Sequence, residues 1–164
     1  MKILKTLNVK TPARGTSVAA GLDFFVPEDT LEFRNAFYEK NPNITLNNDG
    51  ITLYPHQRVN IPSGIKAEVP HGYALIAYNK SGVSLKHGLD IGASVVDEDY
   101  KGVIHLSLVN TSKLPVKIEF GQKIIQFLLI PVLYEGVEEV NSEEELFTRE
   151  SERGEGGFGS TGTK

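Results

Sequence analysis

Apolar and polar residues alternate with a period of two along most of the chain. The clearest runs are residues 65–69, 103–109 and 116–120, where every second side chain is apolar, as expected of strands with one buried face. Glycine and proline punctuate the chain between such runs, as at residues 62–64 and 70–72. Many short strands separated by such turns predict an all-β protein, either a sandwich or a barrel.

Two segments depart from this alternation. Residues 28–50 are long and polar, and we interpret them as an insertion that contains one short helix. Ser142 followed by Glu145 fits a capping box, in which two side chains satisfy free N–H groups at a helix start, so one helical turn is expected there. The pattern therefore predicts a β domain over residues 1–140 and a C-terminal arm over residues 141–164.

The composition is that of an ordinary globular domain. The 164 residues, 40% of them hydrophobic, can bury one core. A formal net charge of −4 argues against a nucleic-acid-binding protein. The chain has no cysteine, which excludes disulfides and thiolate metal sites and fits a cytoplasmic protein. Residues 1–9 lack the apolar core of a signal peptide, and the longest apolar stretch, residues 124–134, is too short to span a bilayer, so we expect no membrane association.

The histidines do not indicate a metal site. His56, His71, His87 and His105 are far apart, and no two have the spacing of metal ligands. We expect them to be surface residues or hydrogen-bonded strand residues. The sequence also lacks the G-x-S-x-G turn that presents a nucleophilic serine.

The C-terminus is the segment whose composition points most directly to a ligand. From Arg153 to Gly162 it combines glycines with one cation, one aromatic ring and two hydroxyls. Glycine backbone can adopt positive φ and present N–H groups to an anion, and arginine binds phosphate through a planar fork. Phe158 offers a face on which a base can stack. Phosphate and base together indicate a nucleotide; the alternative is a flexible linker or an expression remnant.

The densest acidic motif is GASVVDEDYKG, residues 92–102. Two valines lead into Asp97 and the turn Asp-Glu-Asp-Tyr leads out, a pattern that we interpret as the tip of a β-hairpin. One interpretation makes Asp97 a general base beside the ring of Tyr100, which packs on a substrate. The alternative is a solvated acidic turn.

Three further motifs are less specific. Lys80, Ser81 and Gly82 follow a predicted strand and could hold phosphates with an ammonium, a hydroxyl and backbone N–H groups. The spacing of a Walker loop is absent, and the alternative is a turn before an exposed helix start. Asp23 ends the small-residue run AAGLD, and Gln126 interrupts an apolar run; an ordinary strand entry and a satisfied core amide are the alternatives.

Together the motifs are more specific than any one of them. AAGLD, NKSGVS, GASVVDEDYKG, GQKIIQ and RGEGGFGSTG, in this order, resemble the five ordered motifs of the trimeric dUTPases over about residues 19–162. The resemblance implies a jelly-roll-like β domain that forms a homotrimer, with active sites at subunit interfaces and the arm of one chain closing another chain's site. It also implies hydrolysis of dUTP to dUMP and pyrophosphate with Mg²⁺, a reaction of nucleotide metabolism.

The resemblance implies a role for each candidate residue. Asp97 would activate the attacking water, and Tyr100 would lie beneath the deoxyribose and exclude a 2′-hydroxyl. The segment around Ser94 would bind uracil through backbone hydrogen bonds, and Asp23 would organise water around the metal. The other residues that would contact the substrate are Lys80, Ser81, Gly82, Gln126, Arg153, Gly159, Ser160 and Thr161, with Phe158 stacking on uracil.

Three features depart from the family pattern. Lys80 stands where arginine is usual and lacks its bidentate fork, Ser94 stands where glycine is common, and residues 28–50 lengthen the span between the first two motifs. The related dCTP deaminases share the fold but carry a catalytic glutamate shortly after the Asp-Tyr motif, whereas residues 103–107 contain no acid. A nucleotide-binding regulatory protein is the alternative from another class.

Overall fold

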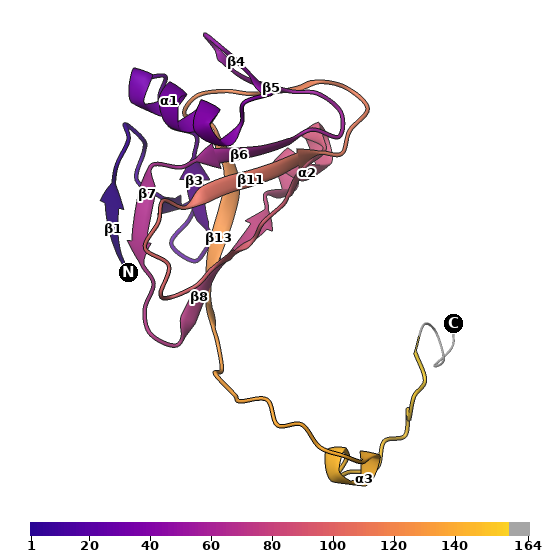
Figure 1. The fold of residues 1–164 in the computed structure, drawn as a ribbon. Helices are drawn as coiled ribbons and strands as arrows, with labels where there is room; N and C mark the ends of the chain where they lie inside the picture. The colour runs from indigo at the N-terminus through magenta and orange to yellow at the C-terminus, as the bar shows by residue number, and fades with distance from the viewer. Residues whose placement is uncertain (158–164) are drawn as a thin grey trace. The chain divides into compact units, whose positions relative to one another are not determined.

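The computed structural model describes residues 1–157 of the 164. The chain divides into two compact units, residues 1–133 and a second unit that begins at Tyr134 (Figure 1). Strands make up most of the regular structure, as predicted for an all-β protein. The described residues contain three short helices, whereas the sequence pattern predicts one or two.

The strands of the first unit are short, and turns or loops rich in glycine, proline and polar residues separate most of them. In chain order they are β1 (Lys2–Lys5), β2 (Ala13–Arg14), β3 (Leu22–Phe25), β4 (Thr45–Asn47), β5 (Gly50–Leu53), β6 (Arg58–Pro62), β7 (Ile65–Glu68), β8 (Tyr73–Asn79), β9 (Leu89–Ile91), β10 (Val95–Val96), β11 (His105–Asn110), β12 (Val116–Ile118) and β13 (Lys123–Pro131). They form antiparallel sheets with the orders β10-β8-β13-β3-β2, β6-β11-β9, β12-β5-β4 and β1-β7.

Strand β13 is central to the largest sheet. Its sequence KIIQFLLIP is nearly continuously apolar, as expected of a strand whose two faces are both at least partly covered, and it pairs with β3 and β8. Phe127 of β13 packs on Phe24 of β3 with ring centroids 4.7 Å apart, and both side chains are almost fully buried. Leu75 of β8 and Leu106 of β11 belong to the same hydrophobic cluster, so the two sheets that carry them share one core.

The helix expected within residues 28–50 is present as α1 (Leu31–Lys40). The Thr30 hydroxyl caps it by accepting a hydrogen bond from the Phe33 N–H at 3.1 Å. Phe33 and Phe37, four residues apart on the helix, are fully buried in the core. The segment is therefore more than a polar insertion, because it contributes two aromatic rings to the core of the first unit.

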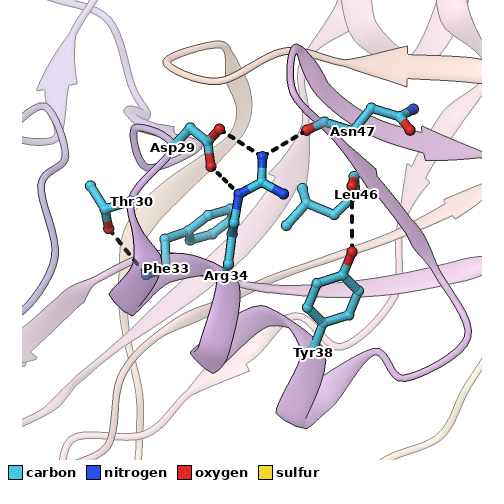
Figure 2. A network of polar contacts seen from close by, with 7 residues as sticks. All are labelled: Asp29, Thr30, Phe33, Arg34, Tyr38, Leu46 and Asn47. Carbon is cyan, nitrogen blue, oxygen red and sulfur yellow. Dashed lines mark hydrogen bonds and ion pairs between the residues drawn. The ribbon is translucent and has the colours of Figure 1, made fainter.

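Polar contacts tie α1 to β4 (Figure 2). Arg34 forms a two-pronged ion pair with Asp29, at 2.6 and 2.7 Å, and also donates to the Asn47 carbonyl at 3.2 Å. The Tyr38 hydroxyl donates to the Leu46 carbonyl at 3.4 Å. Since Leu46 and Asn47 belong to β4, these contacts anchor the helix to that strand.

In the second unit, the capping box confirms the predicted helical turn. Helix α3 (Glu143–Leu146) follows Ser142, whose hydroxyl accepts from the Glu145 N–H at 3.3 Å. The Glu145 carboxylate reaches back to the Asn141 N–H at 3.0 Å. No helix in the described part of the chain is long and apolar enough to cross a membrane.

Candidate functional site

The acidic motif lies in the connection between β9 and β11. These strands pair with each other, but the connection is a wide loop. Its centre, β10, pairs with Ile76 and Leu75 of β8 in another sheet. The prediction of a hairpin tip is therefore wrong in this respect. The valines before Asp97 bond to a strand that is distant in sequence, which local alternation cannot reveal.

A pocket of about 250 Å³ lies beside this loop. Its polar lining comes mostly from the loop and from β11, which contribute Ser94, Asp97, Tyr100, His105 and Ser107, and Asn60 of β6 completes it. Its apolar lining includes Val96, Ile104 and Phe127. Three of the predicted site residues therefore line one cavity. Apolar walls with a few polar groups are typical of a small-molecule site.

The ring of Tyr100 is held across Gly102. Its hydroxyl donates to the Val103 carbonyl at 2.9 Å. A Cβ at position 102 would lie 2.3 Å from the Tyr100 hydroxyl oxygen, so the glycine is needed for the ring to take this position. Tyr100 is 42% exposed, which leaves it accessible to a ligand in the pocket.

Asp97 is the carboxylate of the acidic turn that lines the pocket. Its carbonyl accepts from the Tyr100 N–H at 3.2 Å, which closes the turn, and the residue is exposed. The neighbouring Glu98 instead accepts from the Gly72 N–H at 2.7 Å and contacts His71 Nδ1 at 3.0 Å. Glu98 thereby anchors the loop to the turn before β8.

A second cluster forms around Asp23 on β3. One carboxylate oxygen of Asp23 accepts from the Lys80 ammonium, and the other lies 3.2 Å from Lys123 Nζ. The structure thus brings two predicted site residues together and adds Lys123. The motif GQKIIQ contains this lysine, but the sequence gives no reason to distinguish it from a solvated lysine at a strand start.

Gln126 belongs to the same cluster, since it lies directly opposite Asp23 in the sheet. Its half-buried amide donates to the Asn79 carbonyl at 2.9 Å. A Cβ at Gly21 would lie 2.4 Å from Gln126 Oε1, so the glycine of AAGLD makes room for this side chain. The motifs AAGLD and GQKIIQ are therefore packed against each other.

Helix α2 (Ser81–His87) starts directly after Lys80, which is its N-cap residue. Ser81 and Gly82 form its exposed first turn, in agreement with the helix-start interpretation of this motif. The ammonium of Lys80 points to Asp23. The three residues predicted to bind phosphate thus lie at one end of β8.

A polar network that the sequence analysis missed attaches α2 to β9. The Asp90 carboxylate accepts from Ser84 Oγ at 2.7 Å, Asn79 Nδ2 at 2.8 Å and Thr111 Oγ1 at 3.0 Å. These hydrogen bonds lower the pKa of Asp90, with the largest effect from Ser84 and the next from Thr111, although burial acts in the opposite direction. Asn79 and Ser84 stand at the two ends of the motif NKSGVS, but nothing in that motif points to Asp90 or Thr111.

Arg153 lies in the second unit, in a turn that Gly154 allows. Gly154 has φ +53°, and its N–H donates to the Ser151 carbonyl at 3.3 Å and to the Ser151 hydroxyl at 3.2 Å. This is the positive φ expected of a glycine in the motif. The other arm residues predicted to bind substrate, Phe158, Gly159, Ser160 and Thr161, lie outside the described residues.

A second hollow in the first unit lies away from the candidate site residues. A hollow of about 590 Å³ lies between the end of α2 and the loop before β12. It contains none of the predicted site residues. Within residues 1–157, no group of three or more His, Cys, Asp or Glu side chains could hold a metal ion.

Several curated relatives bear the name deoxyuridine 5′-triphosphate nucleotidohydrolase. A protein from Wolbachia pipientis is 32% identical over 155 residues, which cover 92% of this chain and 86% of the relative. A protein from Mus musculus is 33% identical over 152 residues, which cover 92% of this chain and 77% of the relative. A protein from Chlamydia pneumoniae is 42% identical over 114 residues, or 68% of this chain and 76% of the relative.

Solved structures share the fold. The dUTPase of Staphylococcus bacteriophage 80alpha with dUPNHPP has a TM-score of 0.74 and 23% identity over 98% of this chain and 97% of that chain. A mutant dUTPase from phage phi11 of S. aureus, studied for the coordination of a structural Mg(II) ion, has a TM-score of 0.68 and 19% identity over 87% of this chain and 97% of that chain. These likenesses confirm the jelly-roll-like β fold.

The family model for dUTPase matches residues 45–162, most of the chain and every candidate site residue except Asp23. The curated relatives extend the match over nearly the whole length. The chain therefore belongs to the dUTPase family.

Proposed function

We propose that the pocket beside β10 binds the deoxyuridine part of dUTP and that the cluster of Asp23, Lys80 and Gln126 binds its phosphates. As a dUTPase, the protein hydrolyses dUTP to dUMP and pyrophosphate. The observation that carries the assignment of the two sites is their common support, β8. The Ala77 N–H donates to the Ser94 carbonyl at 2.7 Å, and Lys80 follows the end of the same strand. Three residues of extended chain span about 10 Å, a suitable separation for the two ends of a nucleotide.

Asp97 is the proposed general base. It accepts a proton from a water molecule as that water attacks the phosphorus nearest the sugar. A new P–O bond forms, the bond to the bridging oxygen breaks, and pyrophosphate leaves with the electron pair. Exposure of Asp97 at the pocket supports this role, because the base must be reached by both water and substrate.

Tyr100 and the β10 segment are proposed to select the nucleoside. A ring fixed across Gly102 can pack beneath the deoxyribose and leave no space for a 2′-hydroxyl. The Ser94 carbonyl already accepts from Ala77. Backbone binding of uracil would therefore use neighbouring groups of residues 92–96.

The phosphates are proposed to bind at the start of α2. Lys80 carries three N–H donors, and its ion pair with Asp23 fixes the ammonium where the exposed turn of Ser81 and Gly82 begins. Lys123 adds a second cation on the other side of Asp23. Two lysines give this part of an acidic protein a local charge suited to a triphosphate.

Mg²⁺ is the proposed cofactor, and the residues present fit an ion that arrives with the substrate. Mg²⁺ is commonly held by substrate phosphates and waters with few protein ligands. Both oxygens of Asp23 face lysines, which suits a contact through water better than direct ligation. When bound, the ion would neutralise charge on the phosphates.

A homotrimer with shared sites is the proposed assembly. Arg153 would add charge at the phosphates, and Phe158 would stack on uracil while Gly159, Ser160 and Thr161 close around the phosphates. The turn at Gly154 supports an arm that can present backbone N–H groups to an anion.

Substrate selection is the direct test. Release of pyrophosphate is measured from dUTP, dCTP, dTTP and UTP, each with and without Mg²⁺. We expect turnover of dUTP with Mg²⁺ and little from the others. Equal turnover of UTP would remove Tyr100 from its proposed role, and deamination of dCTP would contradict the assignment as a whole.

A further inference from the structure

We propose that Asn41, the residue that ends α1, positions the base pocket by fixing the backbone of Asn60. Asn60 lines the pocket, whereas Asn41 does not. The inference gives a role to the helical segment within residues 28–50. It rests on the proposed function, because it takes the pocket to be the site of the uracil base.

The side-chain amide of Asn41 spans both backbone groups of Asn60. Its Oδ1 accepts from the Asn60 N–H at 2.7 Å, and its Nδ2 donates to the Asn60 carbonyl at 3.0 Å. The same Nδ2 donates to the Phe37 carbonyl of α1 at 2.9 Å. Asn41 is 5% exposed, so water has little access to replace these bonds.

The location of Asn60 at a sheet edge explains this arrangement. Strand β6 is the outer strand of the β6-β11-β9 sheet, and both backbone groups of one residue in an antiparallel strand point to the same side. Those of Asn60 are bound by Asn41. The amide thus takes the place of a neighbouring strand and satisfies groups that an edge would leave unpaired.

The effect passes from Asn60 to the catalytic loop through β11. Asn60 lies opposite Ser107, which also lines the pocket. The Ser107 carbonyl accepts from the Gly92 N–H at 2.9 Å, and a Cβ at Gly92 would lie 2.5 Å from Ser107 Oγ. Gly92 begins the loop that carries Asp97, so a shift of β6 would change the width of the base pocket.

None of these contacts involves the phosphate cluster of Asp23, Lys80 and Gln126. Loss of the Asn41 amide should therefore weaken binding of the base while binding of phosphate is retained. A residue that only stabilises the fold would weaken both or neither. Deoxyuridine and pyrophosphate, as competitive inhibitors of dUTP hydrolysis, separate the two halves of the substrate.

The experiment compares Asn41→Ala with Arg34→Met in the full-length protein. The Arg34 variant loses the ion pair with Asp29 that Figure 2 shows on the same α1 segment. The side-chain hydrogen bonds of Arg34 go to Asp29 and Asn47 rather than to Asn60. Inhibition constants for deoxyuridine and for pyrophosphate are measured beside a thermal melt. For Asn41→Ala we expect the inhibition constant of deoxyuridine to rise by about threefold to tenfold, the effect of one or two lost hydrogen bonds. The inhibition constant of pyrophosphate should rise by less than about twofold. Arg34→Met should change neither constant, whatever its melting temperature.

Equal changes for both inhibitors, no change for either, or the same deoxyuridine effect in Arg34→Met would overturn the inference. If Asn41→Ala does not fold, Asn41→Ser is judged by the same criteria, since its hydroxyl retains one polar group but is too short to reach both groups of Asn60. A wild-type protein that neither binds deoxyuridine nor hydrolyses dUTP would overturn the proposed function and this inference with it. A normal wild type with an unselective variant would overturn the inference alone.

Discussion

Lys80 and Asp23 are 57 residues apart in the chain, and their ion pair joins the start of α2 to β3. The Asp23 side chain is 9% exposed and that of Lys80 is 21% exposed. The pair is therefore shielded from solvent. Lys123 contacts the second oxygen of Asp23, so the carboxylate lies between two cations.

Replacement of Asp23 should destabilise the protein. Asp23→Asn leaves the ammonium groups of Lys80 and Lys123 near each other with no compensating charge. Removal of one partner from a shielded ion pair should lower the free energy of unfolding by about 2–3 kcal/mol. This value is below that for a fully buried pair because Lys80 remains partly exposed to solvent. Denaturant unfolding measures this change. Asp49→Asn is the control, since the Asp49–Lys117 pair is exposed and its loss should have no measurable effect. Equal stability of Asp23→Asn and wild type would show that the cluster contributes nothing to folding.

A methyl group at position 102 should disturb sugar selection. The Cβ of Gly102→Ala would lie 2.3 Å from the Tyr100 hydroxyl oxygen, so the ring must move and the hydrogen bond to Val103 must break. We expect the ratio of kcat/KM for dUTP over UTP to fall by about tenfold, the effect of a single steric contact in a pocket. Gly15→Ala, where a Cβ meets open space, is the control. An unchanged ratio would place the 2′-selecting group elsewhere.

The structure gathers the candidate residues most closely where one motif holds them together. Ser94, Asp97 and Tyr100 come from one loop, and the structure places all three on one pocket. The predicted hairpin geometry was wrong because β10 pairs with β8, through residues that are 19 and 21 positions apart. Local alternation reports which side chains face inward but carries no information on which strand lies alongside.

The remaining features are relationships between distant residues. The Asp23–Lys80 pair, the space that Gly21 leaves for Gln126 and the bonds from Asn41 to Asn60 each join residues from different strands or helices. In the sequence, Asp23 appears only as an isolated acid, Gly21 as a small residue and Asn41 as a polar residue after a helix. The polar composition of residues 28–50 likewise concealed the buried rings of Phe33 and Phe37, because two apolar positions one helical turn apart are a weak pattern.

His105 should give the stability of the protein a pH dependence of definite sign. Burial lowers the pKa of its ring, with a hydrogen bond to the Val103 backbone in partial opposition. The unfolded chain therefore binds more protons at this site than the folded one. The contribution of His105 to stability is complete above the unfolded value of 6.5 and is lost as the pH falls below it towards the lower folded value.

Urea unfolding at about pH 8 and about pH 5, on either side of the histidine range, measures this effect. The decrease in stability at the lower pH should be smaller in His105→Gln than in wild type. His87→Gln, on the exposed side of α2, controls for the loss of an imidazole. If His105→Gln loses as much stability as wild type, the acid sensitivity arises from other groups.

Removal of residues 153–164 should abolish most turnover and leave the first unit folded. Residues 141–157, the described part of the arm, contribute nothing to the hydrophobic core cluster, whose members lie within residues 1–133. A closing arm positions groups and excludes water from the reaction. Steady-state kinetics and a thermal melt of the truncated chain provide the test, and full-rate hydrolysis of dUTP would show that the arm is only a linker.

The same truncation tests the proposed assembly. Chains truncated before Arg153 and chains with Asp97→Asn, mixed under conditions that allow subunit exchange, should recover part of the activity. Sites that combine an intact Asp97 with an intact arm can then form between different chains. Sedimentation that shows only monomers, or no recovery after verified exchange, would count against shared sites.

The central claim is that Asp97 activates the attacking water, and the turnover of Asp97→Asn tests it most directly. The amide preserves the shape of the side chain and removes its basicity, so kcat for dUTP should fall by about 10²–10⁴-fold while dUTP binding changes little. Asp99→Asn, two residues further along the same exposed turn, is the matched control and should retain near wild-type turnover. A large loss confined to Asp97→Asn is the expected result, and near wild-type kcat in that variant would contradict the account.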